Sequence, residues 1–337
     1  MFRGRSPSRW ISRARRSRVG LSFFVAVAIG LAGAAPAAGQ LRRDGLVQGV
    51  GAARAGDALI GVGVTRVSNA AFPLGGLRGD LTSAPVVHGI WAVGPRVVFQ
   101  VRGAARQVLS IEARDRPAAV ELDPVVQEGT TRDVGDFELA VSFAPLGGAE
   151  GFSAGGHLGV KLPNSDETRG IGPNTTDVTI AALFSWVSAR WRATGWFGVG
   201  ILEAPTRSFE QNDVFAYAFE SLWQVRPNWG LSLGTRGRAS TRRVSPIGAG
   251  DLGEVRAGVE WRRGKLAIDA GLGHGYSEMS GDWSLRAGVA WVLGGGAGNP
   301  WRNVATFATM SAPRPIGRPG DAGSGSREYP TKVHARE

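Results

Sequence analysis

The chain has 337 residues, of which 51 are Gly, 11 are Trp and none is Cys, and its formal net charge is +11. Without Cys there is no disulfide framework and no Cys-ligated metal or iron–sulfur site. Residues 1–39 hold seven Arg and no acid, and residues 294–337 hold six basic and three acidic residues, so residues 40–293 are close to neutral. The positive charge therefore gives no support for a nucleic-acid partner.

The first 39 residues have the organisation of a signal peptide. An Arg-rich stretch over residues 1–18 is followed by an apolar run over residues 19–32 and by small residues up to position 39. The apolar run is shorter than the ~20 residues that a membrane-spanning helix needs. We expect cleavage after this leader, with an uncleaved anchor as the alternative, and a short periplasmic segment over residues 40–57.

Residues 58–293 alternate between apolar and polar or small side chains. Near the end of this region, for example, Trp283, Leu285 and Trp291 share one face of a strand, and Ser284 and Arg286 share the other. Strict alternation predicts strands with one apolar face. We predict about twelve strands, over residues 58–69, 85–94, 96–112, 134–144, 152–163, 175–189, 191–204, 213–226, 229–241, 252–262, 265–276 and 282–293.

The lengths of the connections and the positions of aromatic residues favour a membrane barrel over a soluble β-sandwich, which also shows alternation. Connections after odd-numbered strands are mostly long, those after even-numbered strands are short, and Trp residues lie near strand ends, as in outer-membrane barrels. The sequence therefore predicts an all-β fold: one transmembrane antiparallel β-barrel with both ends in the periplasm. The long connections are residues 70–84, 113–133, 164–174, 205–212, 242–251 and 277–281.

If the apolar faces meet lipid, the alternate faces line the lumen. The charged residues and the histidine placed there are His157, Lys161, Arg192, Arg236, Arg238, Glu254, Arg256, Glu260, Asp269 and Arg286. Such a mixture of charges suits either a polar pore that sorts solutes or a salt-bridged plug. A twelve-stranded barrel lies between the filled eight-stranded and the open sixteen-stranded ones, so size leaves both readings open.

Residues 294–337 are rich in Gly, Pro, Ser and Arg and show no periodicity. This composition predicts a disordered C-terminal tail.

One segment resembles an outer-membrane family known as the "meta-pathway of phenol degradation" family, which is transporter-like. A strand ends in Lys-Leu-Pro at residues 161–163, a polar loop holds Gly-x-Gly at residues 170–172, and Asp177 begins the next strand. An Arg-Pro-Asn-Trp turn at residues 226–229 is similar too, and the resemblance covers residues 130–293. It implies a barrel that passes small, apolar or aromatic molecules.

The leading functional prediction is a barrel in the cell outer membrane that lets small solutes pass. Its expected partners are outer-membrane lipid, the barrel-assembly machinery during insertion and a small-molecule solute. The first alternative is a plugged structural or adhesive barrel that binds partners through the outer connections 70–84 and 113–133.

The second alternative is an outer-membrane lipid hydrolase, for which a Ser activated by a His is required. His274 and Ser277 lie together at the long-connection end of a strand, whereas His157 and Ser153 are separated by about 13 Å along a strand. We assign no catalytic, cofactor or metal residue, because the His residues of the barrel region, at 88, 157 and 274, are scattered. The prediction is that the protein is not an enzyme.

Overall fold

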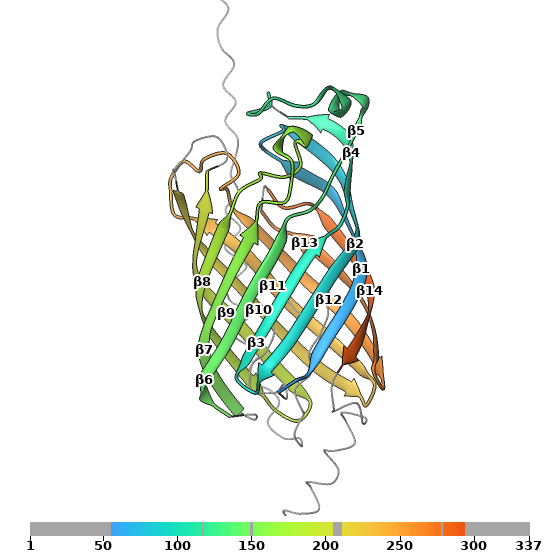
Figure 1. The fold of residues 1–337 in the computed structure, drawn as a ribbon, viewed down its shortest axis with the longest axis vertical. Helices are drawn as coiled ribbons and strands as arrows, with labels where there is room; N and C mark the ends of the chain where they lie inside the picture. The colour runs from blue at the N-terminus through green and yellow to red at the C-terminus, as the bar shows by residue number, and fades with distance from the viewer. Residues whose placement is uncertain (1–54, 116, 149–150, 205–210, 278, 294–337) are drawn as a thin grey trace, which may run out of the picture.

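A computed structural model describes residues 55–115, 117–148, 151–204, 211–277 and 279–293, which form one β-barrel (Figure 1). The predicted leader, residues 40–54 and the predicted tail lie outside the described residues. Among the described residues, no helix has the length and apolar character to cross a membrane. The elements are β1 (Ala58–Phe72), β2 (Leu77–Gly94), β3 (Val97–Ala104), β4 (Gln107–Arg114), η1 (Pro124–Glu128), β5 (Thr130–Asp133), β6 (Phe137–Gly147), β7 (Gly151–Leu162), η2 (Glu167–Arg169), β8 (Asp177–Val187), β9 (Trp191–Glu203), β10 (Gln211–Arg226), β11 (Trp229–Ser240), β12 (Leu252–Arg263), β13 (Leu266–Gly275) and β14 (Trp283–Leu293).

Twelve strands close the barrel, as predicted. Going around the ring, β1, β2, β3 and β6 to β14 each pair with the next, and β14 pairs with β1 to complete it. All of these pairings are antiparallel, and in the closing pair Ala58 lies opposite Leu293. Every backbone group of the wall therefore has a neighbouring strand to bond to, which is the condition for crossing a bilayer with strands.

The predicted long connection 70–84 is wrong. β1 and β2 continue through most of it, with residues 73–76 as the turn between them and Ala70 paired with Gly79. The two strands are 15 and 18 residues long. They exceed the 9–11 residues that cross a bilayer, so the hairpin extends beyond the membrane on the extracellular side.

The predicted strand 96–112 is interrupted, and the predicted loop 113–133 contains structure. β3 pairs with the lower part of β2 and with β6, whereas β4 pairs with the upper part of β2 and with β5. β4 and β5 thus form a hairpin that rises above the ring (Figure 1). With β1 and β2 this hairpin is the extracellular extension, whose apolar centre holds Leu77, Leu109, Val126 and Ile171.

The outer surface of the ring is apolar, and its inner surface holds the polar side chains. Exposed apolar residues follow every second position along the strands, whereas the positions between them are mostly buried. Several aromatic residues lie near the short turns, as in the interfacial girdle of a membrane barrel. The outward-facing girdle residues are Trp91, Phe99, Phe152, Trp186, Trp223, Trp229 and Trp291.

Candidate functional site in the barrel lumen

The lumen contains a cavity of about 500 Å³ in its extracellular half. We call it the vestibule. Its lining runs from Phe72 at the extracellular end of β1 and Ser280 in the β13–β14 connection to Trp196 and Ala218 near mid-barrel. The vestibule is lined by six cationic residues, namely Arg102, Lys161, Arg236, Arg238, Arg256 and Arg286, and by three acidic ones, Glu138, Asp177 and Glu254. Cations therefore outnumber carboxylates on its surface.

One wall of the vestibule is built around Glu254 on β12. Its carboxylate lies 3.4 Å from Arg236 Nε, 3.0 Å from Arg256 Nε and 3.3 Å from Arg286 Nη1, and it also accepts a hydrogen bond from the Ser284 hydroxyl. The residues come from β11, β12 and β14, which bring them together because each faces inward in register. Three guanidinium groups from three strands thus converge on one carboxylate in this wall.

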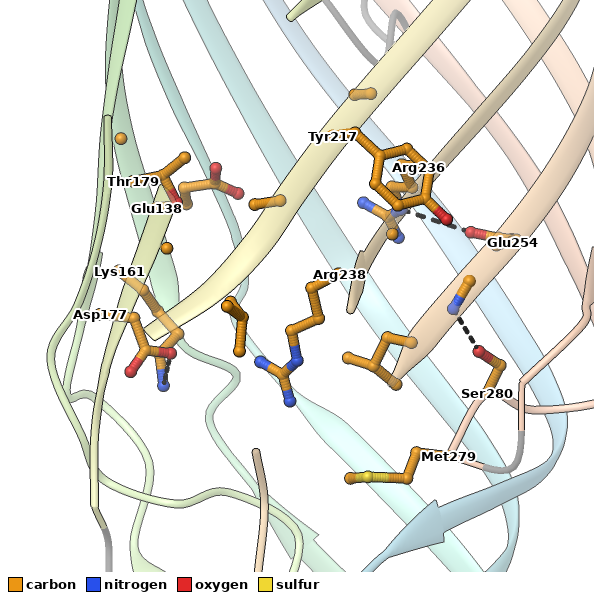
Figure 2. Close-up of a pocket in the computed structure, with 18 of the residues that line it drawn as sticks. Glu138, Lys161, Asp177, Thr179, Tyr217, Arg236, Arg238, Glu254, Met279 and Ser280 are labelled. Atoms are coloured by element: carbon orange, nitrogen blue, oxygen red, sulfur yellow. Dashed lines mark hydrogen bonds and ion pairs between the residues drawn. The ribbon is translucent and has the colours of Figure 1, made fainter. Parts of the chain in front are cut away.

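The facing wall carries the other two acidic residues of the lining, Glu138 and Asp177 (Figure 2). Lys161 on β7 lies 3.1 Å from Asp136 and 3.1 Å from Asp177, and its ammonium also donates to the Thr175 hydroxyl. Glu138 on β6 lines the same side of the cavity. The charged side chains of the vestibule therefore come from both sides of the ring, with arginines around Glu254 on one wall and carboxylates around Lys161 on the other.

Arg238 lies between the two walls and connects the lumen to an extracellular loop (Figure 2). Its guanidinium donates to the backbone carbonyls of Gly248, at 2.6 Å, and Gly250, at 3.3 Å. Both glycines belong to the connection between β11 and β12, so this arginine holds the loop at the mouth of the vestibule.

The structure brings together most of the residues that the alternation placed in the lumen. His157, Lys161, Arg236, Arg238, Glu254, Arg256 and Arg286 all line the vestibule. Arg192, Glu260 and Asp269 also lie at inward-facing positions, but nearer the periplasmic turns than the vestibule lining. That these ten residues line a path for solutes remains a prediction.

Sequence reasoning missed several lumen residues that the same alternation identifies. Trp196, Arg102, Glu138 and Asp177 line the vestibule, and Ser142 bonds to the buried His157, with 2.9 Å between Ser142 Oγ and His157 Nδ1. The period-two pattern places each of them on the inward side of its strand. The charged Arg102, Glu138 and Asp177 follow from the alternation directly, whereas Trp196 and Ser142 require that aromatic and hydroxyl residues be considered along with the charged ones.

His274 and Ser277, the pair considered for hydrolysis, are engaged by different partners. The ring of His274 lies 4.6 Å from that of Trp283, and its Nδ1 is 2.7 Å from the Asp282 carbonyl. Ser277 donates to the Asp251 carbonyl at 2.9 Å. Within the described residues, no group of three or more His, Asp or Glu residues has the arrangement of a metal site.

A closed antiparallel barrel with an apolar outer band, an aromatic girdle and a charged lumen defines a membrane-spanning β-barrel of the outer-membrane type. The chain is similar to a solved outer membrane channel from Pseudomonas putida F1, with a TM-score of 0.50 and 16% identity over 72% of this chain and 97% of the other. This likeness supports the barrel fold that the sequence predicted.

Two further solved structures align less well. The NanC porin aligns at 9% identity over 70% of this chain and all of its own, with a TM-score of 0.45. The CymD monoaromatic hydrocarbon channel aligns at 9% identity over 72% of this chain and 89% of its own, with a TM-score of 0.37. No family model and no curated protein matches the chain.

Proposed function

We infer that the protein lets small solutes pass across the outer membrane through its lumen. The observation that carries this proposal is the vestibule: a cavity of about 500 Å³ inside a closed barrel, lined by charged side chains from both walls. A cavity of this size suits a small molecule. The ten predicted lumen residues would form the wall of the path.

The likeness to an outer membrane channel agrees with this proposal, because the two chains share a fold and nearly the whole of the other chain is matched. Fold alone does not set function, however, and the lumen carries the argument. The small, apolar or aromatic solutes that the sequence resemblance implies remain part of the proposal.

The test is liposome swelling with the purified, refolded protein. Liposomes that contain the folded barrel should swell in isotonic arabinose faster than liposomes that contain heat-unfolded protein. A shift in gel mobility between boiled and unboiled samples shows which preparation is folded. A folded barrel that gives no swelling with any small solute would contradict the proposal.

A plugged barrel that binds partners outside the cell is the second candidate. Two observations favour it: inward-facing apolar side chains toward the periplasmic ends of the strands form a buried cluster, and the extracellular extension has an apolar centre of its own. Val125 and Val134, on the connections that flank β5, are apolar and exposed. Such a barrel would keep its partner binding after deletion of the lumen charges and would conduct no solute.

A further inference from the structure

Arg238 on β11 is a lumen cation that contacts backbone carbonyls in place of a carboxylate. Its Nη2 and Nε atoms donate to the carbonyls of Gly248, at 2.6 Å, and Gly250, at 3.3 Å. Among the described residues, its Nη1 has no hydrogen-bond partner, and no carboxylate lies within ion-pair distance of its guanidinium. An arginine is not deprotonated in proteins, so Arg238 brings a full positive charge to the vestibule.

The carboxylates that attract Arg238 through space are bonded to other groups. These carboxylates belong to Asp177 and Asp251. Asp177 lies 3.1 Å from the Lys161 ammonium, and Asp251 accepts a hydrogen bond from the Ser240 backbone N–H at 2.7 Å. Their charges weaken the field of Arg238 but do not occupy its Nη1 atom, which is therefore available to a solute.

The vestibule as a whole has more cations than carboxylates. Six cationic and three acidic side chains line it. When Asp136, which pairs with Lys161 at 3.1 Å, is added as a fourth carboxylate, six cations still face four acids. Glu260 and Asp269 face inward nearer the periplasmic turns and do not belong to this lining. A cleft in which one sign of charge is in excess raises the local concentration of solutes of the opposite sign.

The guanidinium of Arg238 is held where an anion can reach it. Figure 2 shows it in the space between the two walls, with Lys161 on one side and Arg236 on the other. Its two bonds to the β11–β12 connection fix the side chain before a solute arrives. A guanidinium forms strong, charge-assisted hydrogen bonds with a carboxylate, and a donor that is already ordered loses little entropy on binding.

We propose that the vestibule takes up small organic carboxylates and that Arg238 binds their carboxylate group. This proposal rests on the proposed function and names the class of solute. A carboxylate that approaches Arg238 is attracted by Lys161 and Arg236 as well, whereas a neutral solute of the same size gains none of this attraction. Arg238 thus selects by charge at the extracellular end of the lumen.

The first test compares gluconate with sorbitol, which are nearly equal in size and differ by a carboxylate in place of a hydroxymethyl group. The initial uptake of each radiolabelled solute is measured in phosphatidylcholine liposomes that contain the folded barrel, with valinomycin present so that potassium follows the anion. By size alone the two rates should be equal, whereas the charge of the vestibule predicts that gluconate enters about threefold faster. In Arg238→Gln the ratio of the two rates should fall toward one.

The second test measures the attraction of anions without any passage of solute. The chain has no Cys, so Thr179→Cys places a single thiol in the vestibule lining. Its reaction rates with anionic and cationic methanethiosulfonates are measured in an uncharged detergent, each relative to the rate for a small thiol in solution. The anionic reagent should be favoured, and adding Arg238→Gln should lower the ratio of the two rates about fivefold, because one nearby charge acts on the two reagents in opposite senses.

Two matched variants serve as controls. Arg96→Gln also removes an arginine that donates to two backbone carbonyls, those of Pro145 at 2.9 Å and Gly147 at 3.4 Å, but at a periplasmic turn. It should leave both ratios unchanged. Arg238→Lys keeps the positive charge and should keep the preference for the anionic reagent. Heat-modifiability shows that each variant is folded.

The outcomes separate this proposal from the proposed function. If the Thr179→Cys thiol does not favour the anionic reagent, or favours it equally in Arg238→Gln, the anion site is wrong, while equal uptake of gluconate and sorbitol would still support solute passage. If Arg238→Lys behaves like Arg238→Gln, the loop contacts and not the charge determine the preference, and the proposal is wrong. If the anionic reagent is favoured but the folded barrel takes up neither solute, passage is wrong and the vestibule is an anion-binding site of a plugged barrel.

Discussion

At the scale of single residues, Glu254 is the carboxylate that contacts the largest number of arginines in the vestibule wall. Its carboxylate is shared by Arg236, Arg256 and Arg286, and its side chain is only 17% exposed. Removing the carboxylate of a buried ionic group takes a favourable contact from each cation around it and destabilises the protein. The partial exposure of Arg236 moderates this effect, since water screens its charge.

We expect Glu254→Gln to lower the free energy of unfolding by about 2 kcal/mol, because three guanidinium groups would then face one another. Urea unfolding of the barrel in lipid vesicles, followed by Trp fluorescence, measures the loss. The same variant should shift the reversal potential in a KCl gradient toward anion selectivity, since a lumen carboxylate is lost.

Asp80→Asn provides the control for this prediction. Asp80 pairs with Arg66 at 2.8 Å, but the Arg66 side chain is 62% exposed and the pair lies on the extracellular extension. An exposed ion pair contributes less than about 1 kcal/mol. If both variants lost the same free energy of unfolding, the three arginine contacts of Glu254 would contribute no more to stability than one exposed ion pair.

The alternation of the sequence predicts which way a residue faces but not its depth in the lumen. Arg236 and Glu260 both face inward, yet the first lines the vestibule and the second does not. Depth depends on the tilt of the strands and on the stagger between neighbours, which are properties of the closed ring. For this reason the inner faces could be predicted, whereas the vestibule could not.

At the scale of elements, the strands within the membrane were predicted closely and the extracellular extension was not. β9 and β14 begin and end within a residue of the predicted bounds. In the membrane, lipid on one side and the lumen on the other impose a strict period of two. Beyond it, β2 and β4 pack against η1 and the β7–β8 connection, so residues such as Leu77 and Leu109 are buried by loops.

The β7–β8 connection contains a pH-sensitive cap at η2. Asp166 accepts hydrogen bonds from the Thr168 hydroxyl, at 2.7 Å, and from the Thr168 backbone N–H, at 3.0 Å. These bonds, with the nearby charge of Arg169, hold the pKa of Asp166 below its usual 3.8. Because the pKa is lower in the folded state, the carboxylate stabilises the loop above pH 3.8, and this contribution is lost as the pH falls further.

We therefore expect pepsin to cleave the 163–176 connection faster as the pH is lowered from 4 toward 2, relative to its cleavage of an unfolded reference peptide. Asp166→Asn should remove most of this dependence. Asp133, which accepts the Asp166 N–H, acts in the opposite sense because burial raises its pKa, so its protonation favours the folded loop. An Asp166→Asn variant with an unchanged pH profile would contradict the role of the cap.

At the scale of the whole molecule, the outer surface determines that the barrel resides in lipid. Leu233 on β11 faces outward and is 49% exposed. A charged side chain on the lipid face of a barrel costs about 2–4 kcal/mol near the bilayer midplane. We expect Leu233→Arg, well inside β11, to lose about this much stability in vesicle unfolding experiments.

The matched control for Leu233→Arg is Thr179→Arg, which places the same side chain inside the vestibule. Thr179 lies on the wall that carries Glu138, so the added charge meets water and a carboxylate (Figure 2). Its cost should be below about 1 kcal/mol. If both variants lost equal stability, the assignment of inner and outer faces would be wrong.

The closing pair β1–β14 places the two ends of the ring side by side, with Ala58 opposite Leu293. A short linker between these positions would make the barrel continuous, and the ring itself has no preferred starting strand. A circularly permuted gene that begins at β11 and ends at β10 should therefore encode the same twelve-stranded wall. Its new ends would emerge at the periplasmic turn at residues 227–228.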